Sequence, residues 1–330
     1  MDATASEFLR GLRGSRSQVQ LARRLGYRGN PITDWERGER FPTAEEALRV
    51  ASTVGVNVPA AFRRFASSTG TLAQRGRGFE LARWLDALRG ATTVTELSQR
   101  LGGSRFSVAR WLSGAAKPRL PDFFRLLDAI SGRLPEWVAE LVAIEQVPSL
   151  VARFRAASAA KRLAFELPWT EAVLRILETS DYRKQRANRS AFIAGCLGVS
   201  APEVERCIEQ LQLAGVVEKR GAKYVVKGQM VVDTQGGKQA LHGLKRHWSH
   251  VATERLQTPR EADFFAYNLI SVSRADLERI REKLSSTFRE IRSLVAASQP
   301  EEAAALINLQ VVSFLPQAPE PLREPSSVAT

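Results

Sequence analysis

The 330-residue sequence predicts a mainly α-helical protein built from several small domains. Three observations lead to this fold class: a helical pattern that occurs twice in the first half, a helix–turn–helix–hairpin order after residue 168, and a strand–helix–strand pattern near the end. In the first half we expect a helical domain at 1–65, a linker at 66–78 and a second, degenerate copy of the domain at 79–144. In the second half we expect a helical linker at 145–167, a unit ending in a hairpin at 168–228, an α+β unit at 229–315 and a disordered tail at 316–330.

The repeat relates Leu12–Pro42 to Leu88–Pro118 without a gap, at an offset of 76 residues. The matching positions carry the same residue in both copies: Leu12-Arg13-Gly14 and Leu88-Arg89-Gly90, Leu21 and Leu97, Leu25-Gly26 and Leu101-Gly102, Trp35 and Trp111, Gly38 and Gly114, Pro42 and Pro118. A set of matches in one register indicates two copies of a single structural unit.

Each copy predicts two short helices joined by a tight turn. In the first copy, Ser17 is a plausible N-cap, Leu21 and Leu25 share a helical face, and Gly26 ends the helix. The second helix begins near Gly29, tolerates Pro31 in its first turn, and ends at Gly38. Two short helices across such a turn form a helix-turn-helix unit.

The residues of the first copy resemble a known family. The pattern Gln18-x-x-Leu21-Ala22-x-x-Leu25-Gly26, followed by Ile32-x-x-Trp35-Glu36-x-Gly38-x-x-x-Pro42, resembles the xenobiotic-response-element type, the family of Cro and the phage repressors, over about residues 5–62. The resemblance implies that the second helix reads the major groove of DNA. It assigns base contacts to Asn30, Thr33 and Asp34, and phosphate contacts to Gln18 and Arg28.

The second copy, about residues 80–137, keeps the fold pattern but departs from the family at two positions. Val94 replaces the glutamine at the start of the first helix, and Leu112 replaces Glu36. The equivalent candidate positions are Arg105 and Arg110 for bases, and Ser104 and Lys117 for phosphates, with Phe106 and Ala109 between them. The copy either contacts DNA through these residues or serves packing or dimerisation.

Residues 168–228 predict a winged-helix order. Helices are expected at Glu171–Thr179 and from Ser200, which forms a capping box with Glu203, to Ala214; strands Val216–Glu218 and Tyr224–Val226 follow. The helix that would read DNA carries Glu203, Glu205 and Glu209 against Arg206 alone, and acidic residues repel phosphate. A structural or dimerising unit is therefore favoured, although the basic hairpin could still touch a DNA backbone.

Within residues 229–315 the sequence predicts a basic helix to about Leu256, then a strand at 264–272, a long helix from Ser273 to about Ala297 and a second strand at 306–314. The long helix carries an apolar stripe, which we expect to be buried by packing. Residues 168–315 resemble a domain of unknown function found behind helix-turn-helix units in bacterial regulators. Pro168-Trp169, Leu197-Gly198-Val199-Ser200, Leu211-x-x-x-Gly215 and the two late strands carry the resemblance, which implies sensing or dimerisation and no reaction.

The composition narrows the class of protein. Forty-eight Lys and Arg residues against 35 Asp and Glu give a net charge of +13, which favours a polyanionic partner or reflects compositional bias alone. No apolar run is long enough to span a membrane, and MDATASEFLR lacks the pattern of a secretory signal. Two cysteines, Cys196 and Cys207, make no disulfide framework. The expected location is the cytoplasm, in association with the nucleoid.

No catalytic motif is present. The sequence has no Walker loop, nucleophile elbow, zincin motif or dinucleotide fingerprint, and its three histidines, His242, His247 and His250, lack the further ligands of a zinc site. We therefore expect no enzyme activity, no cofactor and no metal.

The leading hypothesis is a sequence-specific DNA-binding transcriptional regulator, and the alternative is a protein-interaction adaptor with the same fold. Double-stranded DNA is the expected partner; a second copy of the chain, an effector or another protein stay open, and a membrane is not expected.

Overall fold

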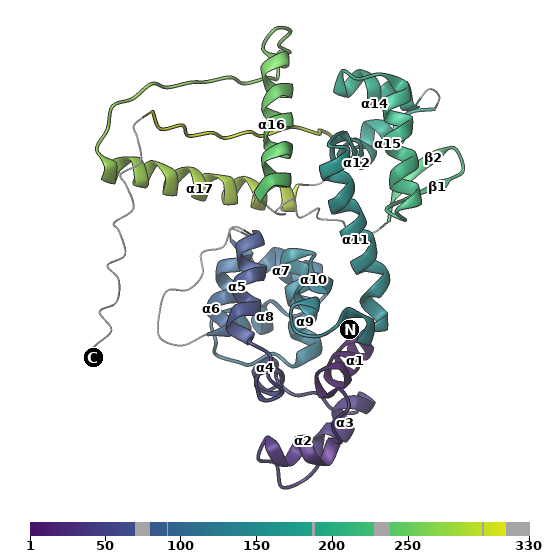
Figure 1. Ribbon diagram of the computed structural model, residues 1–330, viewed down its shortest axis with the longest axis vertical. Helices are drawn as coiled ribbons and strands as arrows, with labels where there is room; N and C mark the ends of the chain where they lie inside the picture. The colour runs from purple at the N-terminus through teal and green to yellow at the C-terminus, as the bar shows by residue number, and fades with distance from the viewer. Residues whose placement is uncertain (70–79, 91, 187–188, 228–237, 299, 315–330) are drawn as a thin grey trace, which may run out of the picture.

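The computed structural model describes residues 1–69, 80–90, 92–186, 189–227, 238–298 and 300–314. The described chain is mainly helical, as predicted, and within it one two-stranded antiparallel sheet is found (Figure 1). No described helix combines the length and the apolar character needed to cross a membrane.

The repeat is confirmed by ten helices that correspond in pairs. The first five are α1 (Asp2–Arg13), α2 (Gln18–Arg24), α3 (Pro31–Arg37), α4 (Ala44–Thr53) and α5 (Val58–Thr69). The second five are α6 (Leu81–Arg89), α7 (Val94–Leu101), α8 (Arg105–Leu112), α9 (Leu120–Ser131) and α10 (Leu134–Ala139). Both sets follow the same order at an offset close to 76 residues, so we name them unit one and unit two.

Local signals in the sequence explain where these helices begin and end. The Ser17 hydroxyl accepts from the backbone N–H of Gln20, and the Gln20 side chain returns the bond, so α2 opens with a capping box. Thr93 and Glu96 form the same box at the start of α7. Gly38 ends α3 in the left-handed conformation, at a φ of 80°, which glycine adopts without steric cost.

The two units share one hydrophobic core. Trp137 of unit two lies against Phe8 and Phe62 of unit one, with ring centroids 6.0 and 5.7 Å apart, and Phe62 also meets Trp84 at 4.6 Å. The buried residues of both units form a single cluster that extends from Ala5 to Leu150. The predicted domains 1–65 and 79–144 therefore pack together around one core. Helix α5 also continues to Thr69, into the predicted linker, and residues 70–79 lie outside the described part.

Backbone contacts join the units in a symmetric way. Thr43 and Arg119 form an isolated antiparallel bridge. The Ala44 N–H donates to the Pro118 carbonyl at 2.9 Å, and the Leu120 N–H donates to the Pro42 carbonyl at 2.9 Å. Thr43 and Arg119 occupy equivalent positions of the repeat, 76 residues apart. Ala44 corresponds in the same way to Leu120, and Pro42 to Pro118, so the two hydrogen bonds are equivalent to each other. We call residues 42–44 with 118–120 the junction; it relates the units by an approximate twofold axis.

One long helix connects this core to a second one. After a short 3-10 turn (Ile144–Gln146), α11 (Pro148–Glu166) places Leu150 in the first core and Leu163 and Ala164 in the second. The predicted helical linker is thus helical, and it is packed at both ends. The second core also holds α12 (Trp169–Leu177), α13 (Ser180–Lys184), α14 (Arg189–Leu197) and α15 (Ala201–Leu213).

The predicted hairpin is present with longer strands. Strand β1 (Val217–Arg220) pairs with β2 (Lys223–Val226), and Gly221 turns between them at a φ of 59°. The buried Tyr182 hydroxyl accepts from the Tyr224 N–H at 3.1 Å, which ties β2 to α13. The Ser200 hydroxyl accepts from the Glu203 N–H, but within the described residues the Glu203 side chain does not bond back to Ser200 to complete the predicted capping box. Cys207 is buried, and Cys196 is half-buried, packed against the same core.

The C-terminal region differs from its prediction in two respects. Helices α16 (Lys238–Arg255) and α17 (Arg274–Ala297) form, the latter capped by Ser273 as expected. Residues 264–272 and 306–314 form no strand, because neither segment makes the ladder hydrogen bonds that define one within the described chain. The apolar stripe of α17 is half-buried to exposed rather than buried; Leu294 is 72% exposed.

The shared core leads to the first prediction. Trp137→Ala should lower the free energy of unfolding by about 3–5 kcal/mol, because the indole fills space between both units. Hydrogen exchange should show reduced protection of α1 in unit one as well as α9 in unit two. Phe106→Ala, at a residue that is 70% exposed, is the control and should change stability by less than about 0.5 kcal/mol. Loss of protection in α9 alone would contradict a common core.

Candidate nucleic-acid interface

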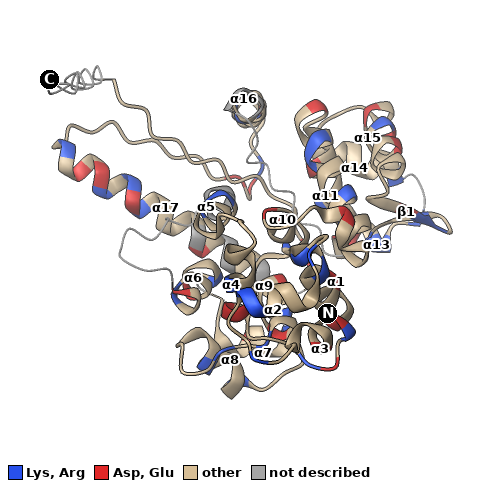
Figure 2. Ribbon diagram, turned by 60° about the horizontal axis from the view of Figure 1, so that its bottom comes forward, with Lys and Arg blue, Asp and Glu red and all other residues tan. Residues whose placement is uncertain are grey.

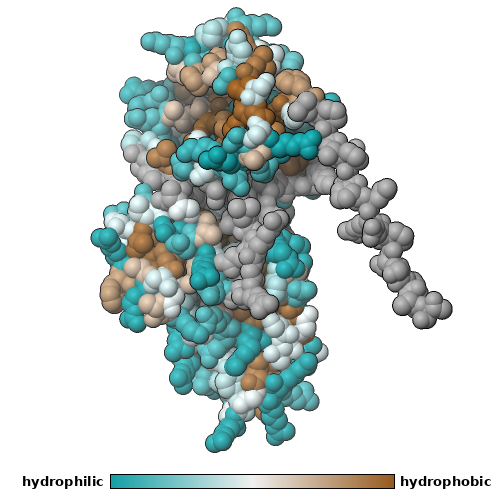
Figure 3. Space-filling model, turned by 90° about the vertical axis from the view of Figure 1, so that its left-hand side faces the viewer, coloured by the Kyte–Doolittle hydropathy of each residue, from teal (hydrophilic) through white to brown (hydrophobic). Residues whose placement is uncertain are grey.

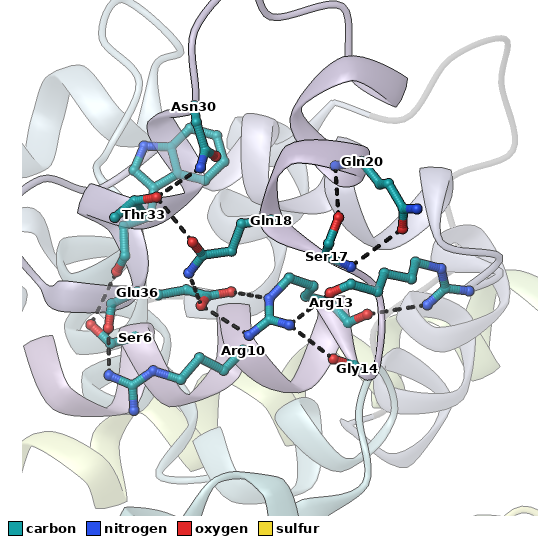
Figure 4. A network of polar contacts seen from close by, with 12 residues as sticks. Ser6, Arg10, Arg13, Gly14, Ser17, Gln18, Gln20, Asn30, Thr33 and Glu36 are labelled. Atoms are coloured by element: carbon teal, nitrogen blue, oxygen red, sulfur yellow. Dashed lines mark hydrogen bonds and ion pairs between the residues drawn. The ribbon is translucent and has the colours of Figure 1, made fainter.

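A chain of hydrogen bonds supports the first turn of α3. The Asn30 Nδ2 group donates to the Thr33 hydroxyl at 2.8 Å, and that hydroxyl donates to the Gln18 Oε1 atom at 3.0 Å. The Gln18 Nε2 group then donates to the Glu36 carboxylate at 2.7 Å (Figure 4). The start of α2 and both ends of α3 are therefore held together by side chains, and α3 cannot rotate without breaking this network.

The network ends on a buried ion pair. The Glu36 side chain is only 5% exposed, and Arg13 of α1 binds it in a bidentate way, with Nε 2.6 Å from Oε1 and Nη2 3.0 Å from Oε2. The hydrogen bond to Glu36 raises the pKa of the Arg13 guanidinium above its ordinary value. Arg10 donates to the backbone carbonyl of Glu36, and Ser6 donates to that of Trp35 at 3.1 Å. Helix α1 thus fixes the C-terminal half of α3.

The predicted base readers of unit one lie together at the start of α3. Asn30 occupies the N-cap position without a side-chain capping bond, and Thr33 and Asp34 follow in the first turn; all three are half-buried. The Asn30 Oδ1 atom is buried, and it has no hydrogen-bond partner within the described part of the chain. Arg28 is exposed in the turn before α3. Gln18, the predicted phosphate contact, uses both its amide oxygen and its amide nitrogen in the network. Its side chain therefore holds α3 in position through Thr33 and Glu36.

Unit two has lost this network. Leu112 is buried where unit one has Glu36, and Val94 stands where it has Gln18. Arg89, the equivalent of Arg13, turns instead to Asp86 on its own helix, at 2.6 Å, and to the Thr92 carbonyl at 2.8 Å. Apolar packing therefore replaces polar positioning under α8.

The surface of α8 is basic and apolar. Arg105 is exposed at its first position, directly after the exposed N-cap Ser104. Phe106, at the position of Asn30, is 70% exposed, and the Arg110 guanidinium lies 5.5 Å from the centre of its ring. Ser104 and Arg105 thus lie at the exposed start of α8, Arg110 lies in the last turn of the same helix, and Lys117 lies just before the junction.

Lys117 and Arg119 act across the junction. The Lys117 ammonium forms an ion pair with Glu45 of unit one, and this hydrogen bond raises the pKa of Lys117. The Arg119 guanidinium donates to the Phe41 carbonyl at 2.9 Å and lines a shallow groove together with Asn30 and Asp34. The start of α3 therefore borders on a cation supplied by the other unit, which sequence reasoning missed because it treated the units as separate.

The unit around α15 offers a less basic surface. Glu205 and Glu209 are exposed on α15, on either side of Arg206. On the hairpin, Arg220 and Lys227 pair with Glu218, and Lys223 donates to the Arg183 carbonyl. Figure 2 shows this mixture of acidic and basic residues around α15 and β1. Acidic residues therefore offset part of the positive charge on this surface.

The comparisons with known proteins concern the second half of the chain. The sequence profile of a family described as "Domain of unknown function (DUF4423)" matches residues 151–314. This range begins within α11 and includes the second core and the C-terminal segments. Neither the curated proteins nor the solved structures contain a significant match to the chain.

The contrast between Arg13 and Arg89 yields the second prediction. Arg13→Ala should lower the free energy of unfolding by about 3 kcal/mol or more, because it leaves the carboxylate of Glu36 buried without its cation. Arg89→Ala is the matched control at the equivalent position, and it should cost less than about 1 kcal/mol because its partner Asp86 is half-exposed. Denaturant unfolding of both variants makes the comparison, and equal losses would show that the buried pair adds nothing specific.

Proposed function

We propose that the protein is a sequence-specific DNA-binding transcriptional regulator, in which α3 and α8 enter the major groove. The observation that carries the proposal is the polar first turn of α3, held in place by the network that ends on Glu36 and Arg13. Readout of base edges requires donors and acceptors in a fixed orientation, and such a network supplies it. The net charge of +13 supports a polyanionic partner in the cytoplasm or nucleoid.

The junction suggests how one chain would meet its operator. Duplex DNA has local twofold axes, and operators of helix-turn-helix dimers are palindromic for that reason. Because the two units are related by an approximate twofold axis within one chain, we expect two half-sites in inverted orientation, with centres about 34–36 Å apart. The half-sites should be unlike, because the first turns of α3 and α8 carry different residues.

The residues on α3 and α8 lead us to expect different base preferences at the two half-sites. Asn30 can pair with adenine, and Asp34 can accept from cytosine. In unit two, Arg105 and Arg110 favour guanine, and the ring of Phe106 suits a thymine methyl group. Residues 151–314 would then dimerise or sense a signal, in keeping with their place behind the DNA-binding repeat.

A second candidate function is that of a protein-interaction adaptor, and Phe106 is the observation that favours it. An aromatic side chain that is 70% exposed at the start of α8 is typical of a protein contact as well as of a groove contact. Selection of bound duplexes from a random library separates the two functions. One enriched pair of inverted motifs supports the regulator, and no enrichment at low salt supports the adaptor.

The third prediction concerns unit one. Asn30→Ala should weaken binding to the selected operator by roughly 1–3 kcal/mol and relax specificity at one base pair. Arg28→Ala should weaken binding to all sequences alike and reduce the slope of log affinity against log salt by about one. Fluorescence anisotropy with operator and random duplexes measures both effects. Equal losses of Asn30→Ala on the two duplexes would exclude its role in base readout.

The fourth prediction concerns unit two. The double variant Arg105→Ala/Arg110→Ala should lower affinity for the full operator but spare binding to an isolated unit-one half-site. Both arginines are exposed on α8, so their removal should not disturb the shared core. Footprinting provides the readout: protection of the second half-site should be lost first. A footprint of one half-site that the double variant leaves unchanged would show that unit two does not contact DNA.

A further inference from the structure

Exposed apolar side chains are concentrated in one region of the molecule. Of the nineteen large apolar side chains that are exposed in the described residues, fifteen lie between residues 264 and 314. They are Phe264, Phe265, Tyr267, Leu269, Ile270, Val272, Phe288, Leu294, Val295, Leu306, Ile307, Leu309, Val311, Val312 and Phe314. Figure 3 shows apolar surface in the upper part of the molecule, where α16, α17 and the two extended segments lie. Such a concentration marks an interaction surface rather than scattered surface residues.

The two extended segments, 264–272 and 306–314, resemble each other. Each has nine residues, no charged side chain and a high content of aromatic and β-branched residues. Apolar side chains follow one another directly, as in Phe264-Phe265 and Val311-Val312, so both faces of each segment need cover. Strands that are buried on both faces have this composition.

The backbone of both segments is open to pairing. No backbone–backbone hydrogen bond joins residues 264–272 or 306–314 to another part of the described chain. Each segment is anchored near its beginning: the Arg260 guanidinium donates to the Gly195 carbonyl at 3.2 Å, and the Ser180 N–H donates to the Glu301 carbonyl at 2.7 Å. Both then run in the same direction beside α17 (Figure 1). Side-chain bonds from Asn308 and Gln310 to the Ser249 hydroxyl hold the second segment to α16. Within the described residues, the backbone of neither extended segment has a partner.

We propose that a second copy of the chain covers this region, and that the segments 264–272 and 306–314 of both copies pair into one intermolecular sheet with α17 on one face. Two strands alone do not make a stable sheet in water, whereas the four strands of two copies do. A twofold axis between the copies pairs equivalent edges with each other, so the partner carries the uncharged apolar strand that each edge requires. An unrelated partner would have to supply a matching neutral edge by chance.

The area available agrees with the needs of a stable dimer. Covered aromatic side chains bury about 150–250 Å² each, so the five aromatic side chains, at their present exposures, would remove roughly 700 Å² from water. The ten aliphatic side chains add to this, and a standard interface needs about 800 Å² per partner. This inference does not rest on the DNA-binding proposal, because it concerns residues of the C-terminal region alone.

Self-association of the full chain without DNA tests the inference. Sedimentation velocity between about 1 and 100 µM should show a dimer for the wild-type protein. Leu269→Glu should weaken the dimer roughly a hundredfold or more, because two carboxylates then face an uncharged interface. Leu213→Glu is the matched control: Leu213 at the end of α15 is 76% exposed and Leu269 is 77% exposed, so neither change disturbs a core. The control should remain dimeric.

Hydrogen exchange locates the interface. Amides of 264–272 and 306–314 should be protected in the wild-type dimer and exchange freely in Leu269→Glu, while α12 and α15 stay protected in both and show that the variant is folded. A wild-type chain that is monomeric at all concentrations would overturn the inference, whatever else it binds. So would a dimer in which both segments exchange freely, or equal effects of the two substitutions. DNA binding is measured separately, so either proposal can fail alone.

Discussion

The junction between residues 42–44 and 118–120 is the contact on which the arrangement of the N-terminal half depends. Ala44 and Leu120 are the first residues of α4 and α9, and the N–H group at the start of a helix has no partner inside the helix. Each of these buried donors finds the carbonyl of a proline in the other unit. An arrangement that kept both donors buried without these carbonyls would cost about 1–3 kcal/mol for each group. Each unit therefore completes a helix of the other.

This shared frame allows the two units to diverge. Under α3, Arg13, Glu36 and Gln18 form a polar support; under α8, the buried Leu112 replaces the carboxylate. A buried ion pair is weak evidence for stability, since apolar residues of similar volume often stabilise a core equally well. Unit two shows that the fold persists without the pair. The network in unit one is therefore better explained as a means of orienting α3 than as a source of stability for the fold. A helix that reads base edges requires a fixed orientation.

Local features of the fold could be predicted from the sequence, and distant contacts could not. The offset of 76 residues, the caps at Ser17 and Ser273 and the glycine stop at Gly38 are set by neighbouring residues, so they were predictable. The junction and the Arg13–Glu36 pair join residues more than twenty positions apart, and no local pattern encodes such a pairing. The candidate readers on α3 and α8 were found from their positions in the repeat, but the proximity of Arg119 to Asn30 depends on the junction. The segments 264–272 and 306–314 have the composition of strands, but a strand also needs a partner edge, which composition does not provide.

Helix α11 connects the N-terminal repeat to the C-terminal region. Its nineteen residues extend for about 28 Å, and its two ends belong to different hydrophobic cores, through Leu150 on one side and Leu163 and Ala164 on the other. A helix buried at both ends transmits position better than a flexible linker, because bending it would disturb packing in both cores. The orientation of the C-terminal region is therefore coupled to that of the N-terminal repeat. If two copies meet through their C-terminal segments, two N-terminal repeats are held at a fixed separation. A ligand or protein that changed the contact between the copies would then alter the spacing between the α3 and α8 helices of one copy and those of the other, without touching either repeat.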